Sequence, residues 1–215
     1  MIVTLKLFIL SLFLVANVSR AQTPAPSFEG EVVYANTYKS KNPKLKEKEL
    51  ASMMGTVHNY FVKGADYKTI TNGIFAQWQL YVSKENRIYN KMISSDTVFY
   101  NNAAEHDDQV LDSKITKNAT TVLGYACDEL ILTFRSGVHK YYYNAKFHLD
   151  AKLFVNHQYG NFYNYVSRIN AVPLKMIVED GDVTMESVAT KIEAKKLPAN
   201  FFSLPANTKT APSLY

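Results

Sequence analysis

From residue 28 onward the chain is built of short runs of β-branched and aromatic residues, many of them alternating with polar ones. Such runs, bounded by Gly, Asn, Asp and Ser and recurring about every ten residues, are typical of β-strands. They predict about eleven strands, at residues 28–38, 56–62, 67–71, 74–82, 87–93, 97–100, 109–116, 127–134, 138–143, 173–179 and 183–194.

Short links between these runs predict tight hairpins. Gly64, Gly73 and Gly181 lie in links of three or four residues, where glycine readily supplies the positive φ that such turns require. Strands that are neighbours in sequence should therefore pair antiparallel, as a meander.

Two stretches have helical spacing instead. In the first, Asn42 is a candidate cap, Pro43 suits the first helical position and Gly55 suits the position after the end, with Leu50, Met53 and Met54 on one face. In the second, the apolar face comprises Phe162, Tyr165, Val166 and Ile169, with Pro173 beyond the end.

The fold class that follows is mainly β (α+β). We expect a curved antiparallel sheet of about eleven strands that forms a half-open barrel covered by the two short helices, with a two-sheet sandwich as the alternative. Because barrel width grows with the number of strands, the half-open barrel would leave a cavity between sheet and helices.

The N-terminus has the layout of a signal peptide. Lys6 precedes an apolar stretch at residues 7–18, and Ser19-Arg20-Ala21 places small residues where cleavage would leave Gln22 first. We therefore expect a signal peptide at 1–21, a proline-containing linker at 22–27 and a single domain at 28–215. The apolar stretch is too short to span a bilayer, so the mature chain should not cross the membrane.

The charge and the cysteine content of the chain reduce the number of function classes to consider. The chain has 24 Lys and Arg against 19 Asp and Glu, a small and scattered surplus that gives no reason to expect nucleic-acid binding. Cys127 is the one cysteine, so no intramolecular disulfide can form, and none follows the apolar stretch to carry a lipid anchor. We expect Cys127 to be a buried apolar side chain.

Four strings, in this order and spacing, carry a resemblance: GEVVY at 30–34, LGYAC at 123–127, AVPLKM at 171–176 and LPANFFSLP at 197–205. The chain resembles an uncharacterised family of exported bacterial domains, of the type found in Bacteroidetes, related to the lipoprotein-carrier (LolA-like) fold. The resemblance implies a half-open barrel with helical lids. In the characterised carriers of that fold group, an apolar cavity holds acyl chains.

The string at 197–205 also has a physical interpretation. Its prolines stiffen the chain, and Phe201, Phe202 and Leu204 can anchor it. We expect this segment to plug one end of the barrel or to dock on its rim, with ligand contact as the alternative.

No catalytic motif is present. A glycine-rich phosphate loop, a nucleophile elbow, a paired-cysteine motif and a zinc helix motif are all missing from the sequence. His148, Asp150 and His157 form the densest group of metal-ligand residue types, yet a closed site usually needs four ligands. We expect no catalytic residues, no metal and no cofactor.

The aromatic content, 15 Tyr, 12 Phe and one Trp, is the more informative signal. A tyrosine ring is apolar but its hydroxyl needs a partner, which suits a wet cavity or an interface. Residues 141–143 are all Tyr and must present rings on both faces of one strand. As candidate ligand-binding residues we take Trp78, Tyr142, Phe162 and Tyr165, although the apolar face that carries Trp78 is more often simply core.

These observations favour an exported, non-enzymatic binding protein, periplasmic or secreted, for a hydrophobic or amphiphilic ligand such as a lipid or acyl chain. The first alternative is an interaction module that docks a protein of the cell envelope and holds no small ligand. The second is a hydrolase with a dispersed site, which would need a cleft where a histidine meets a carboxylate or a hydroxyl.

Overall fold

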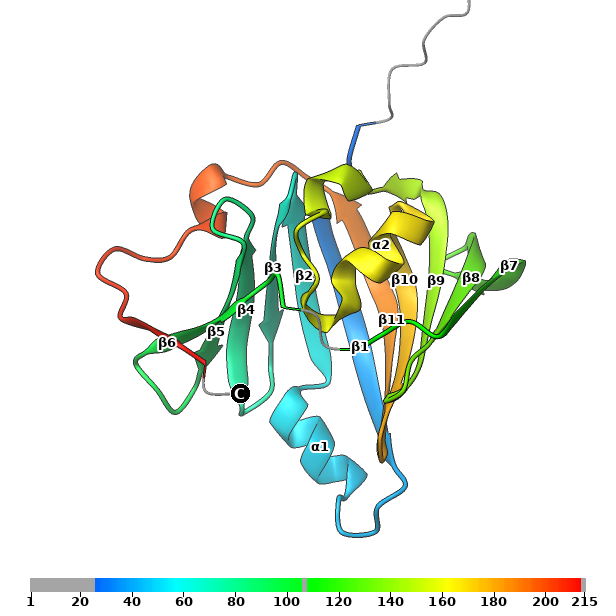
Figure 1. Ribbon diagram of the computed structural model, residues 1–215, viewed down its shortest axis with the longest axis horizontal. Helices are drawn as coiled ribbons and strands as arrows, with labels where there is room; N and C mark the ends of the chain where they lie inside the picture. Colours follow the sequence, from blue (N-terminus) through cyan, green and yellow to red (C-terminus); the bar gives the residue numbers. More distant parts are fainter. Residues whose placement is uncertain (1–25, 106–107, 214–215) are drawn as a thin grey trace, which may run out of the picture.

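The computed structural model describes residues 26–105 and 108–213, which form one curved sheet with one α-helix across its inner face and a second beside the end of a strand (Figure 1). The predicted signal peptide at 1–21 and most of the predicted linker at 22–27 lie outside the described residues. None of the helices in the described part has the length and apolarity needed to cross a bilayer.

The sheet has twelve strands in the order β12-β6-β5-β4-β3-β2-β1-β11-β10-β9-β8-β7. Every neighbouring pair is antiparallel except β12 and β6, which are parallel. The strands are β1 (Gly30–Ser40), β2 (Val57–Lys63), β3 (Asp66–Thr71), β4 (Ala76–Val82), β5 (Arg87–Met92), β6 (Val98–Asn102), β7 (Asp112–Val122), β8 (Tyr125–Thr133), β9 (Gly137–His148), β10 (Ala171–Asp180), β11 (Val183–Ala194) and β12 (Thr210–Pro212).

The predicted fold class is confirmed. All eleven predicted strands form, and the sheet is open, with β7 at one edge and β12 at the other. Two meanders, β1 to β6 and β7 to β11, are joined where β1 pairs with β11 along its whole length, from Gly30 opposite Ala194 to Ser40 opposite Val183.

The turn glycines behave as predicted at two of three positions. Gly64 and Gly181 have φ values of 57° and 53°, but Gly73 does not have a positive φ. A Cβ at Gly73 would lie 2.5 Å from the carbonyl oxygen of Met53. Glycine is required there because the link packs against the backbone at the end of the first helix.

The two α-helices form, but only one covers the sheet. Helix α2 (Phe162–Ile169) lies across the inner face, after the 3-10 turns η1 (Ala151–Phe154) and η2 (Tyr159–Asn161). Helix α1 (Glu47–Met54) lies beside one end of β1 (Figure 1), and none of its residues is buried. It starts later than predicted, because the Asn42 side chain accepts from the backbone N–H of Lys44 in a turn before the helix.

Two apolar clusters lie on opposite faces of the sheet. The larger fills the inner face beneath α2 and includes Cys127, fully buried as predicted. The smaller lies on the outer face of β2 to β6, where the C-terminal segment covers it; its buried members are Leu80, Tyr89, Val98, Leu197 and Phe202.

Candidate ligand-binding groove

The space between α2 and the sheet is filled by the protein's own side chains. Phe154 and Val166 are completely buried there, and the α2 residues Phe162 and Tyr165 are 8% and 9% exposed. The ring of Tyr165 stacks on that of Tyr141 at 4.5 Å between centroids. The expected cavity is therefore occupied, because large aromatic side chains project from both the helix and the strands.

At the centre of this packing lies His157, which is 1% exposed. Its ring stacks on Phe162 at 4.3 Å and lies 4.2 Å from Tyr81, and its Nε2 shares a hydrogen bond of 2.9 Å with the Tyr67 hydroxyl. Burial lowers the pKa of His157 from 6.5 to about 3. The imidazole is thus neutral and belongs to the core.

The four predicted ligand-binding residues do not form one cluster. Phe162 and Tyr165 pack edge to face under α2, at 4.9 Å. Trp78 lies on the outer face, because Leu80, two residues along the strand, belongs to the outer cluster. Tyr142 points away from its buried neighbours Tyr141 and Tyr143, as predicted, and lies 5.5 Å below the ammonium of Lys175.

Trp78 lines a groove on the outer face, which we call the Trp78 groove. One lobe has a volume of about 530 Å³ and the other about 450 Å³, and both are lined by Trp78 and Pro205. The first lobe is also lined by Lys68, Pro198, Asn200, Phe201, Ser203, Leu204 and Ala206, and the second by Lys91, Asp96, Val98, Asn207, Thr208 and Lys209. Strands β3 to β6 form the floor of the groove, and the C-terminal segment 198–209 forms its wall.

The C-terminal segment is held at its start by a polar clamp. A carboxylate oxygen of Glu29 accepts from the backbone N–H of Leu197 at 2.6 Å and pairs with Lys63 at 3.1 Å, and Lys63 also donates to the carbonyl of Leu197. The hydrogen bond from Leu197 lowers the pKa of Glu29, so this carboxylate is ionised at neutral pH.

Beyond the clamp, apolar and strand contacts fix the segment. Phe201 packs against Phe61 at 4.9 Å, and Phe202 is buried in the outer cluster from the 3-10 turn η3 (Ala199–Phe202). Strand β12 then pairs with β6. The sequence predicted that this segment plugs one end of the barrel or docks on its rim. In the structure it packs against the outer face of the sheet and pairs through β12 with β6 at the sheet edge, and it does not enter the end of the barrel.

The groove has an unusual cation. The ammonium of Lys68 lies 5.0 Å from the centroid of the Trp78 ring and 5.1 Å from that of Phe201. Partial burial lowers its pKa from the ordinary value of lysine, because desolvation disfavours the charged form. An ammonium between two rings gains a cation–π attraction, and the aromatic floor thereby carries a positive charge.

Histidines near hydroxyls occur elsewhere, but not in the groove. His157 meets Tyr67 and His139 meets Tyr141 at 3.3 Å, and neither histidine lines the groove. Within the described residues, no three His, Cys, Asp or Glu side chains are grouped so that they could hold a metal. The described lining of the groove thus contains no histidine.

Apart from Trp78, the residues of the groove were not predicted as ligand contacts. In the sequence, Lys68 is an ordinary polar position of an alternating strand, and Lys209 belongs to a polar tail. The proline and phenylalanine string at 197–205 was the one usable signal, since ligand contact was its alternative interpretation.

The chain matches no protein-family model and no curated protein. Among solved structures it is similar to an uncharacterised conserved protein from Thermus thermophilus, with a TM-score of 0.50 and 8% identity over 86% of this chain and 91% of that one. It is similar to PNGF-II, with a TM-score of 0.48 and 13% identity, but covers 32% of that chain. A LolA superfamily protein from Nitrosomonas europaea gives a TM-score of 0.39 and 12% identity, over 84% of this chain and 92% of that one.

At these identities the likeness to the Thermus protein concerns the fold alone. The half-open antiparallel architecture expected from the resemblance is confirmed by the structure. Membership of the exported bacterial family and an origin in Bacteroidetes stay predictions.

Proposed function

We propose that the protein is an exported, non-enzymatic binding protein of the cell envelope, and that the Trp78 groove holds its hydrophobic or amphiphilic ligand. The observation that carries the proposal is the groove itself, two lobes that share Trp78 and Pro205. Phe201 and Leu204 add apolar surface to the first lobe, whereas the second is lined mainly by polar side chains. The volumes of the two lobes fall in the range of about 300–1,000 Å³ that is usual for small-molecule sites.

The groove is a better candidate than the space beneath α2. A ligand under α2 would have to displace rings that already stack on one another, as Tyr165 does on Tyr141. In the groove, by contrast, Trp78 is only partly buried and Pro205 is exposed. Ligand binding there requires no rearrangement of the core.

The sole tryptophan of the sequence makes the proposal directly testable. Titration with the neutral fluorophore N-phenyl-1-naphthylamine should quench Trp78 emission by energy transfer and enhance the emission of the dye. The variant Leu204→Asp should weaken this binding about tenfold, because it places a charge in the apolar wall. Leu153→Asp is the matched control, since Leu153 is 42% exposed on η1, away from the groove.

An unchanged titration with Leu204→Asp would refute the placement of the ligand in the groove. To find a native ligand, protein purified from its own cells is extracted with organic solvent and analysed by lipid mass spectrometry. Crosslinking in intact cells tests the alternative: a defined protein adduct without co-purified lipid would favour an interaction module.

Export is a separate part of the proposal. Protein recovered from the periplasm or the medium should begin at Gln22, and N-terminal sequencing measures this. A mature chain that keeps Met1 would contradict export by a cleaved signal peptide.

A further inference from the structure

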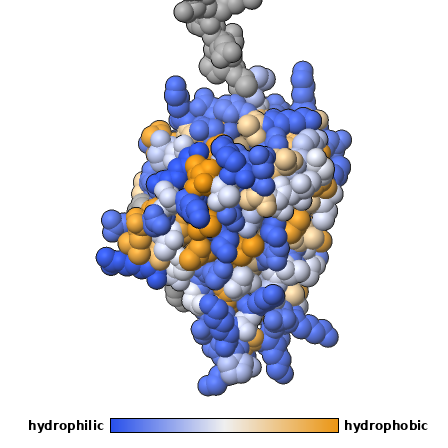
Figure 2. Space-filling model, turned by 90° about the vertical axis from the view of Figure 1, so that its right-hand side faces the viewer, coloured by the Kyte–Doolittle hydropathy of each residue, from blue (hydrophilic) through white to orange (hydrophobic). Residues whose placement is uncertain are grey.

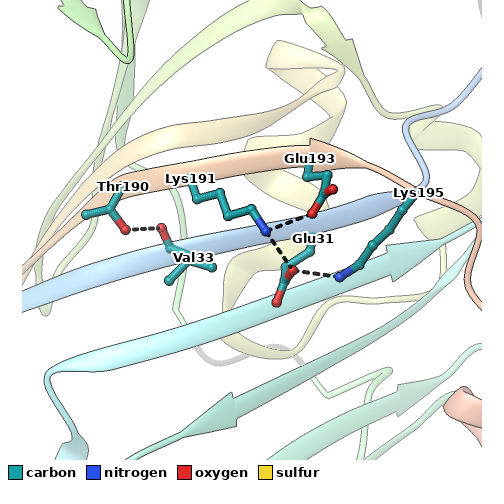
Figure 3. A network of polar contacts seen from close by, with 6 residues as sticks. All are labelled: Glu31, Val33, Thr190, Lys191, Glu193 and Lys195. Atoms are coloured by element: carbon teal, nitrogen blue, oxygen red, sulfur yellow. Dashed lines mark hydrogen bonds and ion pairs between the residues drawn. The ribbon is translucent and has the colours of Figure 1, made fainter.

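The lysines of the outer face differ in whether a carboxylate neutralises them. Beside β1, Lys195 pairs with Glu31 at 2.6 Å, and Lys191 bridges Glu31 at 3.8 Å and Glu193 at 2.7 Å (Figure 3). Lys68 has no such partner among the described residues, and the contacts of its ammonium are the two aromatic rings. The charge at the groove is therefore available to a ligand.

Sheet register places a second lysine on the other side of Trp78. Lys91 on β5 lies directly opposite Trp78 on β4, while Lys68 lies on β3 opposite Leu80. The three side chains thus form a diagonal across the outer face. The Lys91 ammonium donates to the carbonyls of Met92 and Ser95, which hold it in place. Neither carbonyl carries a net charge, and no carboxylate of the described residues forms an ion pair with Lys91.

The groove as a whole has a positive charge. Lys68, Lys91 and Lys209 line its two lobes against a single acid, Asp96. In a cleft with apolar walls, charges of one sign reinforce one another and attract a counter-ion.

We infer that the ligand of the Trp78 groove is an anionic amphiphile, whose apolar chain lies along Trp78, Phe201 and Leu204 and whose carboxylate or phosphate pairs with Lys68. The inference rests on the proposed function, because it specifies the ligand class of the same groove. A neutral lipid would leave the half-buried ammonium of Lys68 without a counter-ion, whereas an anionic group compensates it in a partly desolvated site, where such pairing is strongest.

The experiment compares head groups on one chain length. Decanoate, decyl phosphate, decanol and decyltrimethylammonium are titrated below their micelle concentrations, with Trp78 emission and calorimetry as readouts, and inorganic phosphate is titrated alone. We expect both anionic ligands to bind at least about tenfold more tightly than decanol and decyltrimethylammonium. Inorganic phosphate should give no signal, because it lacks the apolar chain.

Two variants test whether Lys68 causes the preference for anionic ligands. Lys68→Gln should remove most of the advantage of decanoate and leave decanol unchanged. Lys175→Gln is the matched control, because Lys175 also lies over a ring, that of Tyr142, but is paired with Glu186 at 2.6 Å. It should leave both affinities unchanged.

The outcomes separate the two proposals. Equal binding of decanol and decanoate would overturn the anionic ligand class and leave the binding groove standing. A preference for decanoate that survives Lys68→Gln would overturn the pairing of the head group with Lys68. Binding of inorganic phosphate as tight as that of decyl phosphate would show a free-anion site and overturn the amphiphile. If no ligand binds by either readout, the proposed function itself fails.

Discussion

Among single residues, His157 makes the strongest link between packing and chemistry. It is enclosed by rings, and its Nδ1 has no hydrogen-bond partner within the described part of the chain. Burial lowers its pKa to about 3, whereas in an unfolded chain it titrates near 6.5. Between these two values the unfolded chain takes up a proton at this site and the folded chain does not.

The pH dependence of stability follows from this difference. Above pH 6.5 the neutral His157 contributes fully to stability, and as the pH falls from 6.5 towards 3 the fold should lose up to about 1.4 kcal/mol per pH unit through this residue. Urea unfolding at pH 7, 6, 5 and 4 measures the slope. His157→Phe should flatten it, because a phenyl ring keeps the stack on Phe162 and cannot be protonated.

Other histidines do not obscure this test. His58 and His139 also have pKa values lowered by burial, so the wild type will show a combined slope. The difference between wild type and His157→Phe isolates the contribution of His157. Parallel slopes in the two proteins would contradict a buried neutral imidazole.

A second test at this scale concerns Ser187. This residue is 1% exposed and lies directly opposite Asn36 on β1, and among residues 26–105 and 108–213 its hydroxyl finds no hydrogen-bond partner. Ser187→Ala removes an unsatisfied buried group and should raise the free energy of unfolding by about 1 kcal/mol. In the control Ser203→Ala, a hydrogen bond of 2.8 Å to Asn200 is lost, and stability should not rise. Destabilisation by Ser187→Ala would show that the hydroxyl is bonded.

At the scale of elements, the local sequence pattern was sufficient to predict a strand or helix wherever that element buries one face. β11 forms at the residues predicted, and α2 buries all four residues of its predicted apolar face. β12 was missed because Thr210–Pro212 has no apolar pattern of its own and is a strand only through pairing with β6. The face of α1 was predicted from spacing, yet Met53 and Met54 are each 44% exposed, because no element packs over them.

The anchoring of the C-terminal segment to the sheet depends more on one side chain than on the short strand β12. Phe202 is 5% exposed in the outer cluster, and Phe202→Ala should lower the free energy of unfolding by about 3 kcal/mol. It should also weaken dye binding, because the wall of the groove would detach. Phe75→Ala is the control: Phe75 is 53% exposed, so its loss should cost less than about 0.5 kcal/mol. Thermal unfolding gives both values, and equal effects would contradict the anchoring role.

At the scale of the whole molecule, the sheet and its openness could be predicted, but the site could not. Helices over a wide curved sheet suggest a cavity, and only side-chain packing reveals that Tyr67, His157 and Phe162 fill it. The Trp78 groove arises where residues more than 100 positions apart in sequence meet, such as Trp78 and Leu204. No local pattern encodes that meeting.

The open edge of the sheet is the remaining property of the whole molecule. No strand of the described residues lies on the outer side of β7. Leu111, Ile115 and Leu123, on or next to β7, are 54%, 47% and 41% exposed. Figure 2 faces this side of the molecule and shows apolar surface interspersed with polar side chains. Such an edge can pair with another chain unless something disrupts it.

A bulge in the middle of β7 disrupts this open edge. The register with β8 shifts between Thr116 and Thr120, Asn118 has a φ of 52°, and Asp128 holds the bulge by accepting from the backbone N–H of Asn118 at 3.0 Å. Deletion of Asn118 and Ala119 would straighten the strand and expose a continuous row of backbone donors and acceptors. We expect the deletion to strengthen self-association at least about tenfold, measured by sedimentation over a concentration series. Lys117→Ala, which removes only the ion pair with Asp128 at 2.7 Å, should leave association unchanged. If the deletion variant associates no more than the parent chain, features other than the bulge protect this edge.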